Sequence, residues 1–236
     1  MVFPKKIDSR CVKDAIIEIR YSSKLPFEVL VGYIFKSIDD NFTYSNRPIN
    51  PQEQLNFQFS IQHLFFNEKI KFQLQPNSII FNCLNEYVLW DEYLPQIENV
   101  INQILKIEEI DSFTRVGVRY ISEFEMVDFK DTLNFNFSFN QPSIASNTYS
   151  FKSEFEIDKG FVIFQLHNKL RLIQNAENSD VFFSQIDIDV VNQNLSVLRE
   201  NHIELFQIID DLHSIEKRLF FDLLKPEFLK SLNPVY

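Results

Sequence analysis

One stretch of strict alternation, DSFTRVGVRYISEFEM from Asp111 to Met126, restricts most strongly what this chain can fold into. Side chains of a β-strand point alternately to its two faces. One face would carry the apolar residues Val116, Val118, Tyr120 and Phe124. The other would carry Arg115, Gly117, Arg119, Glu123 and Glu125. The stretch therefore predicts a strand with one buried face and one charged face, with a glycine suited to a close approach, a bend or a bulge.

Similar patterns predict the other elements. Alternation predicts strands over 11–22, 55–61, 69–74, 78–84, 133–139, 151–157, 161–166 and 181–191. Helical spacing predicts helices from Pro26 to near Asn41, from an N-cap at Asp91 to Leu105, and from Ser196 to Pro226. The proline-containing segment 43–54 is expected to be a loop, and Gly160 to supply a positive φ in a hairpin turn at 158–160.

This order predicts an α+β fold. We expect a mainly antiparallel, curved sheet in two strand-rich halves, with helices packed on one face and a long C-terminal helix. The 236 residues are expected to form a single domain, with possible halves at 1–127 and 128–236. The 26 phenylalanines indicate an aromatic-rich interior.

Charge and cysteine content limit the partners and the location. A net charge of −10 disfavours non-specific binding to nucleic acid and suits a basic partner better. Cys11 and Cys83 are too few for a disulfide framework and lack metal-ligand spacing, so reduced thiols are expected. The beginning MVFPKKIDSR has no apolar signal region, and no apolar run approaches the roughly 20 residues of a membrane span. We therefore expect a cytoplasmic protein that does not enter a membrane.

Charged side chains on the predicted strands form the first candidate site. The ligand-binding candidates are Glu18, Arg20, Arg115, Arg119, Asp187 and Asp189. If their faces converge in a curved sheet, arginines could bind phosphate and carboxylates could hold Mg²⁺. This layout resembles that of triphosphate tunnel enzymes, although their repeated acidic-x-acidic-x-basic motif is not reproduced. No cofactor is expected outside this alternative.

A structural explanation competes with that site. Opposite charges on neighbouring strands stabilise a sheet by roughly 0.2–1 kcal/mol per pair without any further role. This explanation is favoured for Lys152, Glu154 and Glu156. For the arginines and aspartates we favour a shared network or a ligand site, because an arginine fork matches a carboxylate. His213 is expected to make a core contact or a hydrogen bond, and the histidines and cysteines show no metal-ligand spacing.

Aromatic residues of the last helix and tail suggest a second kind of site. The interface candidates are Phe206, Phe220, Phe221 and Phe228. Such residues either bury the helix on two sides or form an interface with a partner or a second copy. The sequence leaves both interpretations open.

A set of landmarks also resembles a known family. These are Ile17-Glu18-Ile19-Arg20, the run RVGVRYI from Arg115, Ile186-Asp187-Ile188-Asp189, and Leu212-His213-Ser214-Ile215. Together they resemble the sporadically distributed bacterial and archaeal family of uncharacterised proteins of about this length. The resemblance implies a cytosolic protein of patchy distribution, as in mobile or defence-related gene sets, but the family brings no established activity and no assigned catalytic residues. We expect an accessory, antitoxin-like or defence-associated protein that binds another protein; the alternative is a metal-assisted phosphate- or nucleotide-binding enzyme using the charged face.

Overall fold

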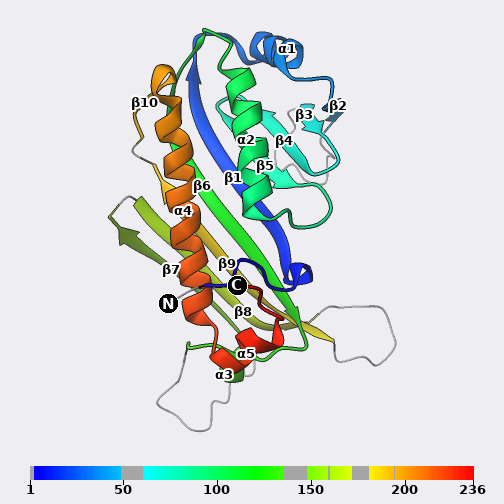
Figure 1. Cartoon of the computed structure of the whole chain (residues 1–236), viewed down its shortest axis with the longest axis vertical. Coiled ribbons are helices and arrows are strands. Elements are labelled where there is room, and N and C mark those ends of the chain that lie inside the picture. The colour runs from blue at the N-terminus through cyan, green and yellow to red at the C-terminus, as the bar shows by residue number, and fades with distance from the viewer. Residues whose placement is uncertain (1–2, 49–60, 136–147, 159, 172–180, 194) are drawn as a thin grey trace.

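The computed structural model describes residues 3–48, 61–135, 148–158, 160–171, 181–193 and 195–236. In these ranges, ten strands form one antiparallel sheet and helices pack on one of its faces (Figure 1). The fold is α+β, as predicted. The strands are β1 Val12–Ser23, β2 Thr43–Pro48, β3 Ile61–Phe66, β4 Ile70–Gln75, β5 Ser78–Cys83, β6 Ile110–Glu125, β7 Tyr149–Ile157, β8 Gly160–Arg171, β9 Phe182–Asn192 and β10 Val197–Leu198. The helices are α1 Phe27–Ser37, α2 Trp90–Ile104, α3 Phe129–Thr132, α4 His202–Leu223 and α5 Pro226–Ser231, with 3-10 turns at Ser9–Cys11 and Arg199–Asn201.

The strand order explains how distant segments meet. It runs β2-β3-β4-β5-β1-β6-β9-β8-β7, with β10 also pairing with β6. Consecutive hairpins build the ends of the sheet, whereas its centre joins β1 to β6 and β6 to β9. The long strand predicted in mid-chain is therefore β6, and it pairs with both strands that carry the other charged candidates.

The core lies between the helices and one face of the sheet. Alternate residues of the central strands are buried there, for example Ile17 of β1, Val118 of β6 and Ile188 of β9. The helices α2 and α4 lie side by side over this face (Figure 1). The apolar face of the strands, which follows from period-2 alternation, thus packs against the apolar stripes of the helices in one aromatic-rich layer.

Several predicted boundaries were wrong. The predicted loop begins with β2, because residues 43–48 pair along β3 despite Pro48, which sits at the end of an edge strand where a missing N–H is tolerated. The strand after it is Ile61–Phe66; residues 55–60 lie outside the described ranges. The α4 helix begins at His202 instead of Ser196, since Val197 and Leu198 pair with β6 first.

The remaining differences are local. Helix α2 begins at Trp90, one residue before the predicted cap, and Leu89 is its N-cap. Leu133 forms an isolated bridge to Leu224 after the short α3, and no strand continues over the described residues that follow it; 136–139 lie outside the described ranges. Pro226 ends the α4 region as predicted and begins α5. Among the described helices, none combines the length and apolar character that a membrane crossing needs.

Candidate functional site on the open face of the sheet

The six charged candidates lie together on the sheet face opposite to the helices, which we call the open face. In the register, Glu18 lies opposite Gly117, Arg20 opposite Arg115, and Arg119 opposite Asp189. The central residues of the open face are Glu18, Arg20, Arg115, Gly117, Arg119, Asp187 and Asp189. The arginine-bearing strand and the aspartate-bearing strand therefore direct these groups to one side of one sheet.

Arg119 and Asp187 form a two-bond fork. Arg119 donates from Nε to Asp187 Oδ1 at 2.8 Å and from Nη2 to Oδ2 at 2.6 Å. The amide of Gln165 on β8 donates to the same carboxylate at 3.0 Å. Asp187 is buried, whereas the Arg119 side chain is 39% exposed. The hydrogen bond to Asp187 is the main reason why the pKa of Arg119 is raised. Charge-assisted, bidentate bonds of this kind fix both side chains.

Glu18 lies between two other arginines. Arg20 donates from Nε to Glu18 Oε1 at 2.8 Å, and Arg115 donates from Nη1 to Glu18 Oε2. The Arg115 and Glu18 side chains are mostly covered, while Arg20 is exposed. One carboxylate therefore already binds both guanidinium groups, which leaves them less available to an anionic ligand.

Gly117 lies between this network and Asp189. A Cβ atom there would lie 3.4 Å from Arg115 Nη1 and 3.5 Å from Asp189 Oδ1, which are ordinary van der Waals distances, so both charged groups flank the glycine on β6. Asp189 forms no hydrogen bond or ion pair with any residue that the structure describes. Burial raises its pKa to about 6, against the opposing effect of Arg115 and Arg119. Asp189 can therefore exchange a proton near neutral pH.

Three amide side chains on the open face bind carboxylates, and the sequence did not predict these contacts. Gln165 binds Asp187, Asn82 donates to Asp14 at 2.9 and 3.1 Å, and Gln185 donates to Glu123 at 3.2 Å. Their alternation places them on this face, but only the strand order identifies their partners. The face is thus a set of paired polar groups in which Asp189 stands apart.

The described residues give no support to a metal site. They contain no group of three or more His, Cys, Asp or Glu side chains that could hold an ion. Asp187 is already bound by Arg119, and Glu18 by Arg115 and Arg20. The Mg²⁺ alternative therefore has no ligand set in this part of the chain.

The charges on β7 lie at the margin of the open face. Lys152 and Glu154 form a 3.2 Å ion pair between side chains that are more than half exposed. Glu156 instead lines a broad groove of about 840 Å³ at the end of the β7–β8 hairpin, with Glu154 and Phe161. An exposed pair of this kind contributes little to stability, about 0–1 kcal/mol.

The aromatic interface candidates largely serve the chain's own core. Phe220 and Phe228 are 7% and 9% exposed and belong to the core cluster. Phe206 and Phe221 are partly buried and pack against that cluster, and Phe221 stacks on Phe3 with ring centroids 5.8 Å apart. Burial of α4 and α5 within the chain therefore accounts for Phe220 and Phe228, respectively.

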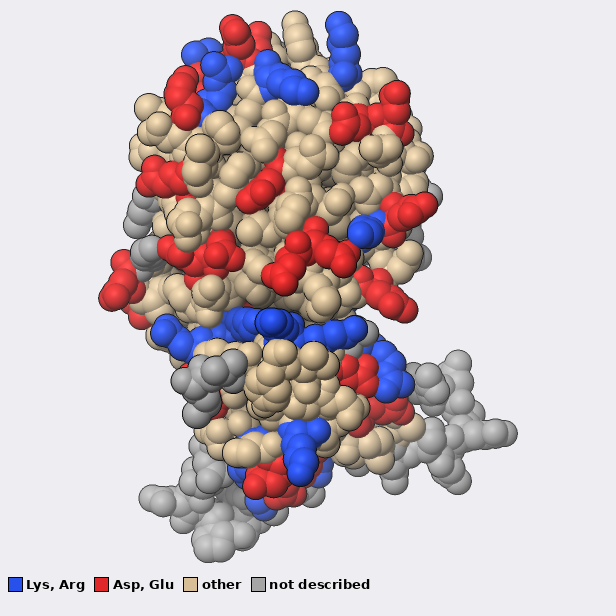
Figure 2. Space-filling model, in the orientation of Figure 1, with Lys and Arg blue, Asp and Glu red and all other residues tan. Residues whose placement is uncertain are grey.

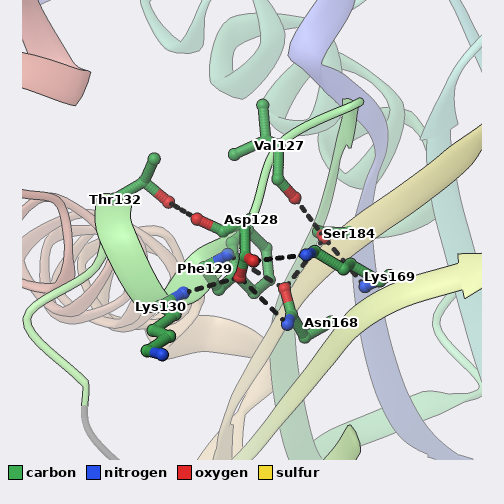
Figure 3. A network of polar contacts seen from close by, with 8 residues as sticks. All are labelled: Val127, Asp128, Phe129, Lys130, Thr132, Asn168, Lys169 and Ser184. Atoms are coloured by element: carbon green, nitrogen blue, oxygen red, sulfur yellow. Dashed lines mark hydrogen bonds and ion pairs between the residues drawn. The ribbon is translucent and has the colours of Figure 1, made fainter. Parts of the chain in front are cut away.

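A second polar network fastens α3 to the sheet (Figure 3). Asp128 caps α3 by accepting from the Lys130 N–H at 3.0 Å and pairs with Lys169 of β8. Asn168 accepts from the Phe129 N–H at 2.9 Å and donates to Asp128 at 3.2 Å. These residues sit at an irregularity in the β8–β9 pairing, where Lys169 has a φ of 55°. The network therefore holds α3 against β8 and is explained by its structural role.

Comparisons with known proteins do not extend this description. No protein-family model, no curated protein and no solved structure matched the chain. The family resemblance given by the sequence landmarks stays a prediction.

Proposed function

We propose that this protein is a cytoplasmic accessory protein that binds a basic surface of another protein through its open face. The observation that carries the proposal is the arrangement of that face, where a fixed set of paired charges lies on a broad sheet surface. Among the described residues, no helix covers it. The family resemblance supports an antitoxin-like or defence-associated role.

The composition of the open face suits a transient protein interface. The aliphatic residues Ile16, Ile121 and Ile163 lie in the same cross-strand rows as the charges and are only half-buried. Non-obligate interfaces have a similar mixture of apolar area and arginine with a polar rim. Side chains already held by ion pairs lose less conformational freedom on binding.

The same ion pairs argue against the enzyme alternative. A phosphate or nucleotide site needs guanidinium groups that are free to bind the anion. Here Arg119 is held by Asp187, and Arg115 by Glu18. Phosphate would have to displace a carboxylate in each case.

Charge determines the kind of partner. The chain carries a net charge of −10, and Asp189 and Glu156 form no ion pair with the described residues. Complementary charge accelerates encounter and excludes acidic partners. A partner with a basic surface is therefore expected, and the complex should weaken as salt increases.

The experiment compares two single substitutions that add the same charge. Ile163→Lys places an ammonium group on the open face, between Asp189 and Glu154 in the register and on the side of the sheet away from the core. Tyr33→Lys adds a charge on α1, where Tyr33 is 48% exposed, and is the control. Wild type and both variants are used to capture partners from the native host, and each captured protein is then purified and titrated.

The proposal requires one basic protein that binds wild type and Tyr33→Lys equally. Its affinity for Ile163→Lys should be at least about tenfold weaker, because an added positive charge on the open face repels a basic partner. Absence of such a protein, or equal binding by Ile163→Lys, would refute the proposal.

A further inference from the structure

A pocket lies on the helix-bearing side of the molecule, away from the open face. It is formed by α2, α4, β6 and the N-terminal segment, with a volume of about 70 Å³. A single water needs roughly 10–15 Å³ of such space, so the pocket holds a few waters or one small organic group. Its walls are mainly aromatic, and the lining includes Tyr87, Trp90, Phe220 and Phe221.

Three buried polar side chains form its floor. Tyr120, His213 and Glu216 are 6%, 6% and 4% exposed. The geometry gives no hydrogen bond to the Tyr120 hydroxyl or to His213 Nδ1, although the Tyr87 hydroxyl is close enough to Tyr120 to affect its pKa. Glu216 has no hydrogen bond or ion pair with a described residue. Leaving such a group unsatisfied costs roughly 1–3 kcal/mol. Two such atoms, the Tyr120 hydroxyl oxygen and His213 Nδ1, line one pocket, which indicates that something other than the described chain satisfies them.

The mouth of the pocket is basic. Lys5 and Lys6 are exposed, Lys217 is half-buried, and none forms an ion pair with a described residue. Figure 2 shows Lys and Arg side chains in a band across the middle of this face, between acidic regions. In a chain with a net charge of −10, a group of lysines without carboxylate partners favours an anion.

The buried side chains of the pocket carry no charge at neutral pH, so they do not neutralise the lysines at its mouth. Burial raises the pKa of Glu216 to about 8, and Lys217 opposes this only in part, so the carboxyl is protonated at pH 7. Burial lowers the pKa of His213 to about 3, so its ring is neutral. The charged and titratable groups around Glu216 are Tyr120 from β6, His213 and Lys217 from α4, Tyr87 ahead of α2, and Lys5 and Lys6 from the N-terminal segment.

We propose that this pocket binds the carboxylate group of a small organic anion. The Tyr120 hydroxyl and the protonated Glu216 carboxyl donate hydrogen bonds to the carboxylate oxygens, and Lys217 supplies the opposite charge. The apolar part of the ligand packs on Trp90 and Phe220 at the wall. A cation would need an ionised Glu216 and would meet three lysines at the mouth.

The chain contains its own reporter for this binding. Trp90 is the only tryptophan, its ring stacks on His213 with centroids 3.8 Å apart, and its Nε1 donates to Asp210 at 2.7 Å. Butyrate and benzoate are titrated against the full chain while Trp90 fluorescence is recorded. Butylamine and inorganic phosphate are titrated in parallel to test a cation and an inorganic anion.

Two variants test the assigned contacts. Tyr120→Phe removes a hydroxyl whose only hydrogen-bonding neighbour among the described side chains is the Tyr87 hydroxyl, so the fold is expected to tolerate it, and Lys217→Gln removes the charge. Tyr33→Phe and Lys152→Gln make the same changes outside the pocket. Each pocket variant should weaken carboxylate binding about tenfold, as the loss of one hydrogen bond to a charged group implies, and each control should not.

The dependence on pH provides a second test. Carboxylate binding should weaken as pH rises through about 8, because Glu216 loses its proton, and Glu216→Gln should remove that dependence. Saturable binding of a carboxylate with these variant effects supports the proposal. A flat titration, which means that water alone fills the pocket, overturns it, as does a response to butylamine or phosphate alone or unchanged affinity in both pocket variants.

Discussion

Single residues determine the geometry of the open face. Gly117 lies between the Arg115 guanidinium and the Asp189 carboxylate, and Arg119 holds Asp187 through two hydrogen bonds. The sequence predicted Gly117 as suited to a close backbone approach, a bend or a bulge, but its pairing is regular and a Cβ atom there would meet only ordinary van der Waals contacts. It could not predict that Asp187 is bound while Asp189, two residues away on the same face, is not.

Asp189 should make the stability of the protein dependent on pH. Its pKa is raised from 3.8 to about 6, so between these values the folded state holds a proton that the unfolded state has lost. Stability therefore falls as pH rises through this window. Asp189→Asn removes the charge, so at pH 7 it should unfold with a free energy higher than wild type by on the order of 2 kcal/mol. The difference should vanish near pH 4, as measured by urea unfolding across this range.

Asp187→Asn is the matched control for Asp189→Asn. It makes the same chemical change two positions away, but it weakens the fork to Arg119 and should lower stability by about 2 kcal/mol at pH 7. Equal effects of the two variants at pH 7 would show that the carboxylates share one environment, contrary to the structure.

At the scale of elements, local patterns predicted the hairpins better than the irregular joints. The β7–β8 hairpin appears as predicted, and Gly160 has the expected positive φ, but it is the first residue of β8 and pairs with Ile157. The irregularity in β8 was missed, because a lysine at positive φ has no signal in an alternating pattern. The start of α4 was missed because Val197 and Leu198, apolar residues within a helical stripe, pair instead with a strand that lies far away in the sequence.

Alanine substitutions at two glycines should change the stability of the protein in opposite directions. Gly160 has a φ of 154°, and a Cβ there would lie 1.8 Å from the Val191 carbonyl oxygen, so Gly160→Ala should cost about 3 kcal/mol through strain and displacement of β9. Gly32 in α1 has no atom within 4 Å of its Cβ position, so Gly32→Ala should stabilise by roughly 0.5–1 kcal/mol. Thermal unfolding of both variants tests these signs, and a tolerated Gly160→Ala would mean that β8 and β9 are farther apart than the structure indicates.

At the scale of the whole molecule, the order of strands decides which residues can act together. Strands from the N-terminal, middle and C-terminal parts of the chain meet at the centre of the sheet, where β1, β6 and β9 lie side by side. The N-terminal segment and the tail also join, through hydrogen bonds between Lys6 and Val235. The open face and the pocket under α4 therefore both depend on contacts between residues far apart in sequence.

This order predicts a gradient of protection from hydrogen exchange. The central strands β1 and β6 pair on both sides and pack under helices, whereas β2 and β7 end the described strand order. Amides of β1 and β6 should therefore exchange with free energies close to global unfolding, and those of β2 and β7 much faster. Exchange measured by mass spectrometry checks this. Strong protection of β7 in the isolated protein would indicate that another chain covers that edge.

The sequence by itself determined most of the strands, although not β2 or β10, together with the two faces of the central strands and the positive φ of Gly160, because alternation and backbone conformation are local properties. It placed Arg119 and Asp187 on outward faces but could not pair them, since they lie 68 residues apart. Only the tertiary structure decided that pairing, the isolation of Asp189 and the burial of Tyr120, His213 and Glu216 in one pocket. Strand register and loss of solvent depend on neighbours brought together by folding, and no local pattern encodes them.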